Sequence, residues 1–187
     1  AAWQDGAGFP KDCPKILFGS GRLHPNIRWL AIHNSRKSKL TRPNAEWLAA
    51  LRQALADDTL AAAGMASSFG STTYDMLTAF AQKTDRPLCL VLPFPLEELM
   101  TNKPSASLLA GKNPQLVVTC QSPILRCSKA QRLFCRDHLL AHLADVNLAL
   151  EIRSRGNLHT ILLEQQAKHP RRLIILQPTN MNPSNAG

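Results

Sequence analysis

The chain has 187 residues, of which 44% are hydrophobic, so it is long enough to bury one core of ordinary size. Its 22 Lys and Arg residues outnumber 13 Asp and Glu residues, and the formal net charge of +9 favours an anionic partner. No apolar run approaches the roughly 20 residues that cross a bilayer, and the N-terminus lacks the features of a signal peptide. We therefore expect a soluble protein of the cytoplasm with no membrane partner.

The 5 cysteines form an odd number in a chain without an export signal, which predicts reduced thiols rather than a disulfide framework. Cys89 lies in an apolar run and is expected in the core. The other residues considered as metal ligands are Cys120, Cys127, Cys135, His138 and His142. They contain no CxxC pair and their spacing fits no common zinc pattern, so we predict no metal and no cofactor.

Short apolar runs alternate with longer amphipathic segments along the chain. The apolar runs predict strands at KILFG near Ile16, WLAIH near Ala31, TLAAAG near Leu60, PLCLVLP near Leu90, QLVVTC near Val117, VNLALE near Leu148 and RLIILQP near Ile174. The segments between them predict helices over Pro43 to Ala56, Ser71 to Gln82, Lys129 to Leu143 and Gly156 to Lys168, with a short helix around Leu96 to Met100. This alternation indicates an α/β, Rossmann-like domain, with a mostly parallel sheet and helices on both faces.

The domain organisation follows from the end of the last predicted strand. Residues 1–178 are expected to form a single domain. Residues 179–187, rich in Asn and Pro, are expected to be a disordered tail or a linker.

Small, hydroxyl and cationic residues follow certain of the predicted strands, at Asn34 to Lys39, Met65 to Thr73 and Ile152 to Asn157. Ligands of open parallel sheets bind at the carboxyl ends of the strands, where backbone N–H groups and helix dipoles are available. These loops therefore predict an anion-binding crevice, although turn geometry, helix capping and a solvated surface would also account for the same residues. The residues assigned to it are Ser35, Arg36, Lys37, Gly64, Ser67, Ser68, Gly70, Ser71, Arg155, Gly156 and Asn157.

Further cations recur at helical spacing in the segment that begins near residue 129. Lys129, Arg132 and Arg136 could extend the crevice as a cationic stripe, and an ordinary polar helix face would look the same. No catalytic residue is assigned.

The order of these elements resembles the DNA-processing protein A (DprA, also called Smf) family over roughly Phe9 to Pro178. FPKDCPKILFGSGRL is similar to the family's Tyr-Pro lead-in and its Pro-Pro-x-Leu-Phe-x-x-Gly motif. LAIHNSRKSKLT stands where the family has a strand ending in Val-Gly-Ser-Arg, so Ser35 and Arg36 match and Asn34 replaces glycine. AAAGMASSFGSTTYDMLTAFAQ resembles Ser-Gly-x-Ala-x-Gly-Ile-Asp and keeps equivalents at Gly64 and Gly70.

The most specific match runs from LFCRDH to the end of RLIILQP. It resembles Phe-x-x-Arg-Asn-Arg, a helix, a strand ending in Glu, Ser-Gly-Ser-Leu-x-Thr, a helix and a strand ending in Pro. The matching residues are Phe134, Arg136, Glu151, Gly156, Leu158 and Thr160, whereas Asp137, His138 and Asn157 depart from the pattern. The chain is therefore expected to be a divergent member.

The resemblance implies a domain that binds single-stranded DNA, generally as a homodimer, and helps to load the recombinase RecA in DNA uptake and recombination. Arg36 would then grip one phosphate, and Arg155 with Gly156 a neighbouring one. Phe69 and Tyr74 are the candidates for stacking on bases.

The same crevice could instead serve a nucleotide hydrolase or a sensor of a free nucleotide. Lonely-guy relatives within the wider superfamily hydrolyse nucleoside monophosphates with a Pro-Gly-Gly-x-Gly-Thr-x-x-Glu motif. This chain has EIRSRGNLHTILLE at the corresponding place, with arginines where glycines are needed, which argues against an enzyme.

Overall fold

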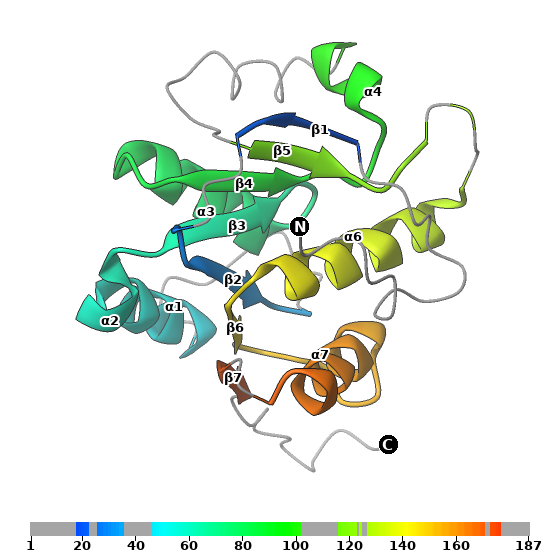
Figure 1. The fold of residues 1–187 in the computed structure, drawn as a ribbon. Coiled ribbons are helices and arrows are strands. Elements are labelled where there is room, and N and C mark those ends of the chain that lie inside the picture. The colour runs from blue at the N-terminus through cyan, green and yellow to red at the C-terminus, as the bar shows by residue number, and fades with distance from the viewer. Residues whose placement is uncertain are drawn as a thin grey trace.

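The computed structural model describes residues 18–22, 26–35, 46–101, 116–122, 124, 127–170 and 173–176. Within these residues, a 7-stranded sheet has the strand order β1-β5-β4-β3-β2-β6-β7 (Figure 1). Strands β2 to β7 pair in parallel with their neighbours, and β1 pairs antiparallel with β5. The predicted α/β, Rossmann-like class is confirmed.

The elements follow the predicted alternation closely. The strands are β1 (Phe18–Gly21), β2 (Trp29–His33), β3 (Gly64–Ser68), β4 (Leu88–Val91), β5 (Leu116–Thr119), β6 (Val146–Ala149) and β7 (Leu173–Leu176). The helices are α1 (Glu46–Ala56), α2 (Asp58–Ala61), α3 (Thr72–Lys83), α4 (Leu96–Thr101), α6 (Lys129–Leu143) and α7 (Asn157–Lys168). The expected domain boundary at residue 178 and the tail after it lie outside the described residues.

The strand predicted at TLAAAG is wrong, because Asp58–Ala61 forms helix α2 and the strand begins only at Gly64. Alanine and leucine are strong helix formers, so the short apolar run does not by itself favour a strand. The true strand, GMASS, contains two serines, which are fully buried with bonded hydroxyl groups. Tertiary hydrogen bonds therefore let a polar segment enter the centre of the sheet.

Helices cover both faces of the sheet (Figure 1). The chain crosses from β2 to β3 and from β3 to β4 through α1 and α3, and right-handed crossovers place both helices on one face. From β5 the chain runs back across the sheet through α6 to β6, which lies beyond β2. This reversal of direction places α6 and α7 on the other face. The largest fully buried side chains between the layers include Leu30, Ile32, Met65, Leu77, Leu88, Leu90, Leu139 and Leu162. In the described part of the chain, no helix is long and apolar enough to cross a membrane.

One cysteine contradicts the expectation that every thiol of the chain is reduced. Cys135 is disulfide-bonded, whereas Cys89, Cys120 and Cys127 are free thiols. Burial raises the pKa of Cys89 to about 12 and that of Cys120 to about 11, so both stay protonated near neutral pH. The number of cysteines could not predict this, because a disulfide depends on which two sulfurs the fold brings together.

We expect Gly64→Ala to lower the free energy of unfolding by about 1–3 kcal/mol, because interiors have no spare volume for a methyl group. A Cβ atom at Gly64 would lie 2.7 Å from Ile27 Cγ2 and 2.7 Å from Trp29 Cζ3. Urea denaturation followed by tryptophan fluorescence would measure the change. Ala62→Ser, at an exposed position nearby, is the control and should change stability by less than about 0.5 kcal/mol. An unchanged midpoint for Gly64→Ala would contradict this account of the contact.

Candidate functional site

The turns after β2, β3 and β6 meet at the carboxyl ends of neighbouring strands, which we call the carboxyl edge. The Ser35 N–H donates to the Glu151 carbonyl at 2.9 Å, and the Leu150 N–H donates to the His33 carbonyl at 3.0 Å. From α6, Arg136 Nη1 donates to the Phe69 carbonyl at 3.0 Å and so joins the turn after β3. The turns after β2 and β6 are thus joined directly, while the single anion-binding crevice stays a prediction.

Two of the assigned cations, Arg36 and Lys37, lie outside the described residues. Ser35, the residue before them, is half-buried at the end of the β2 turn. The contribution of the cationic loop after β2 therefore stays a prediction.

The start of α7 combines a helix terminus without a side-chain cap and two exposed arginines. Gly156 is its N-cap and makes no side-chain cap hydrogen bond, so the first N–H groups of the helix lack a side-chain cap. Arg153 and Arg155 are exposed in the turn before it, and Asn157 is exposed as its first residue. Arg155 has a φ of 59°, a backbone conformation that residues other than glycine rarely adopt. Free N–H groups, the helix dipole and two guanidinium groups all favour an anion here.

The start of α6 adds cations but is already capped. Ser128 accepts from the Gln131 N–H at 3.2 Å, and the Ser128 N–H donates to Gln131 Oε1 at 2.9 Å. Lys129 is exposed and Arg132 is half-buried on the same helix. These two cations can contribute charge, whereas the backbone groups of the first turn are partly satisfied by the capping box.

The polar groups of the turn before α3 are mostly used in contacts within the protein. Ser71 caps the helix by accepting from the Tyr74 N–H at 3.3 Å. Gly70 is exposed with a φ of 88°, and Asp75 forms a hydrogen bond with its backbone. Burial raises the pKa of Asp75, so its carboxylate is less readily ionised than usual. Phe69 stacks on Phe94 with 6.3 Å between ring centroids.

The prediction that Gly64, Ser67 and Ser68 offer donors to a ligand is corrected. Gly64 begins β3 at the opposite end of the strand from the carboxyl edge. Ser67 Oγ donates to the Tyr74 carbonyl at 2.9 Å, and Ser68 Oγ donates to the Val91 carbonyl at 2.6 Å. Both serines are fully buried, so their hydroxyl groups hold α3 and β4 to the strand.

The expectation that Arg136 continues a surface stripe is also corrected, because only 6% of the residue is exposed. Arg136 Nε and Nη2 donate to Asp137 Oδ1 at 2.9 and 2.7 Å. Its guanidinium lies 4.9 Å from the centroid of the Tyr74 ring, and the Tyr74 hydroxyl donates to the same carboxylate oxygen at 3.2 Å. Tyr74 is buried as well and therefore cannot stack on a base. The cluster instead fixes the turn after β3 by holding Phe69.

A buried histidine at the end of β2 was not predicted as part of this site. His33 Nε2 lies 2.8 Å from Asn147 Oδ1, and Asn147 Nδ2 donates to the Ala141 carbonyl at 3.0 Å. This orientation of the amide assigns the proton to His33 Nε2, which leaves His33 Nδ1 as a buried acceptor with no hydrogen-bond partner among the described residues. Burial lowers the pKa of His33. Its position, a polar residue ending an apolar strand, was the sequence signal that could have found it.

These observations define a Rossmann-like α/β domain whose carboxyl edge displays arginines beside an uncapped helix start. In the described part of the chain, no group of three or more His, Cys, Asp or Glu side chains is arranged to hold a metal ion. No protein-family model and no curated protein matches the chain.

Solved structures of DNA processing protein A have the same fold, as the sequence resemblance predicts. The *Streptococcus pneumoniae* protein aligns with a TM-score of 0.64 and 16% identity over 89% of this chain and 56% of that chain. The *Helicobacter pylori* protein, which binds single-stranded DNA, aligns with a TM-score of 0.62 and 17% identity over 92% of this chain and 76% of that chain. This chain thus spans little more than half the length of the *S. pneumoniae* protein.

We expect Arg136→Gln to lower the free energy of unfolding by about 2–4 kcal/mol, because it leaves the Asp137 carboxylate without its main partner. Chemical denaturation followed by tryptophan fluorescence would measure this. Arg132→Gln, one turn earlier on α6, is the matched control, and its effect should stay within about 0.5 kcal/mol. Equal effects of the two substitutions would mean that Arg136 has no special role in stability.

The lowered pKa of His33 predicts that the folded protein loses stability in acid. The unfolded chain binds a proton at this histidine below about pH 6.5 more readily than the folded chain does, so stability falls as the pH falls below that value. We expect His33→Gln, which retains a donor toward Asn147, to reduce the slope of unfolding free energy between pH 7.5 and 5.5 by up to about 1.4 kcal/mol per pH unit. His159→Gln on α7 is the control. Identical slopes for His33→Gln and the unsubstituted protein would exclude this role.

Proposed function

We propose that the chain binds single-stranded DNA by gripping its phosphates at the carboxyl edge. The observation that carries the proposal is the uncapped start of α7 beside the exposed Arg153 and Arg155. The fold likeness to a *H. pylori* protein that binds single-stranded DNA supports the choice of polymer. A net charge of +9 is also consistent with a polyanionic partner.

Cationic side chains and backbone N–H groups would contact the phosphates, and the bases would not be recognised individually. Arg155 and Arg153 would pair with one phosphate while the N–H groups after Gly156 donate to it. Lys129 and Arg132 at the start of α6 would attract a neighbouring phosphate, and Arg36 and Lys37 would add further cations. Because Tyr74 is buried, only the half-buried Phe69 is left of the predicted stacking candidates. Affinity should therefore depend steeply on salt and weakly on base sequence.

The wider role that we propose follows the family resemblance. The protein would act in the cytoplasm as a homodimer that loads a RecA-type recombinase onto single-stranded DNA during uptake and recombination. It would do so without catalysis, since the segment after β6 has Arg153 and Arg155 where the hydrolase motif needs glycines.

Fluorescence anisotropy with labelled oligo-dT of several lengths, at two or more salt concentrations, tests this function. We expect affinity to rise with oligonucleotide length. Arg155→Ala, Lys129→Ala and Arg36→Ala should each weaken binding several-fold and reduce the salt slope by about 0.7. Arg28→Ala, an exposed arginine just before β2 and so at the opposite edge, is the control and should change neither quantity by much.

The same titrations distinguish a DNA-binding protein from the alternative, a sensor of a free nucleotide. A sensor would bind one mononucleotide from a panel, with no gain in affinity from longer oligonucleotides. Length-independent binding, or salt slopes unchanged in all the edge variants, would contradict the proposal of a DNA-binding edge.

A further inference from the structure

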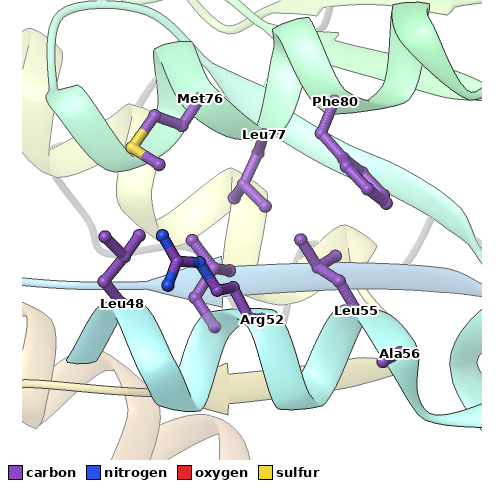
Figure 2. Close-up of a pocket in the computed structure, with 8 residues that line it drawn as sticks. Leu48, Arg52, Leu55, Ala56, Met76, Leu77 and Phe80 are labelled. Atoms are coloured by element: carbon purple, nitrogen blue, oxygen red, sulfur yellow. The ribbon is translucent and has the colours of Figure 1, made fainter. Parts of the chain in front are cut away.

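A second feature lies away from the carboxyl edge, between α1 and α3. A cleft of about 380 Å³ separates these two helices (Figure 2). Its lining is apolar except for one guanidinium group, and consists of Leu48, Leu51, Arg52, Leu55, Ala56, Met76, Leu77 and Phe80. Its volume falls in the range of about 300–1,000 Å³ that is usual for small-molecule sites.

Part of the lining of the cleft also belongs to the hydrophobic core. Leu51 of α1 and Leu77 of α3 are buried and form part of the core. Leu48, which is also buried, and Leu55 point from α1 toward α3, and Met76 and Phe80 point back from α3 (Figure 2). Met76 remains 37% exposed, so part of its side chain is open to solvent at the cleft.

Arg52 supplies the polar character of the cleft. It is exposed on α1, and its side chain is part of the lining of the cleft (Figure 2). Within the described residues Arg52 makes no ion pair, since the salt bridges there join Arg136 to Asp137 and His138 to Glu164. The nearby Arg86 is different, because its guanidinium donates to the carbonyls of Leu60 and Leu55.

We propose that the α1–α3 cleft binds a small amphipathic anion, with its aromatic or aliphatic body between the two helices and its carboxylate or sulfonate on Arg52. Apolar walls would take the body out of water, and the cationic group at their margin would select a charged head. A nucleic-acid backbone fits this cleft poorly, because its closely spaced phosphates would face leucine, methionine and phenylalanine side chains. The cleft and the carboxyl edge therefore favour chemically different anions.

Two fluorescent probes of nearly equal shape test the proposal. 8-Anilinonaphthalene-1-sulfonate carries a sulfonate, whereas N-phenyl-1-naphthylamine is its uncharged counterpart. We expect both to bind the folded protein, with Arg52→Gln weakening the sulfonate about fivefold and leaving the neutral probe nearly unchanged. Arg52→Lys should retain part of the preference, and Arg28→Gln is the matched control on another exposed arginine.

A blocking substitution locates the site. Ala56→Phe, at an exposed lining position, should fill the end of the cleft and weaken both probes by at least about fivefold. Decanoate and 1-naphthoate should displace the sulfonate probe at lower concentrations than decanol does, whereas oligo-dT should not displace it. Unchanged binding in Ala56→Phe, equal effects of Arg52→Gln on both probes, or displacement by oligo-dT would each overturn the proposal. None of these readouts depends on whether the carboxyl edge binds DNA.

Discussion

A buried guanidinium holds the two helical layers together where the strands end. Arg136 of α6 pairs with Asp137, lies over the ring of Tyr74 in α3, and donates to the Phe69 carbonyl in the turn between. A charge removed from water is tolerated only if such contacts surround it. The arrangement therefore links the position of the turn after β3 to the packing of α6, and the geometry of the carboxyl edge depends on it.

The polar residues of this chain divide by burial into two roles. Ser67, Ser68 and Arg136 are buried and use their donors on carbonyl or carboxylate groups of the protein itself. Arg153 and Arg155 are exposed on a turn beside an uncapped helix start, so their charge is available to a ligand. A motif match alone does not separate these roles, because the arginine of the family pattern at position 136 has an architectural role here.

The helix α3 lines the cleft and begins next to the carboxyl edge. Its first turn follows the turn that Arg136 holds at the carboxyl edge, while Met76 and Phe80, farther along, line the cleft against α1. The chemistry of the two places differs in a simple way. Separate cations and free N–H groups suit a chain of phosphates, whereas an apolar wall with a single guanidinium suits one charged head on an apolar body.

The sequence by itself determined the α/β class and most strands and helices, because apolar runs and helical periodicity are local patterns that survive in the fold. It failed at residues 58–68, where a short apolar run forms a helix and the strand after it contains buried serines whose hydroxyl groups bond to α3 and β4. Only the tertiary structure decided that Arg136 is buried, that Cys135 is oxidised, that His33 lies against Asn147, and that α1 and α3 leave a cleft. Each of these depends on which distant residues come into contact, and composition and spacing along the chain carry no direct record of such contacts.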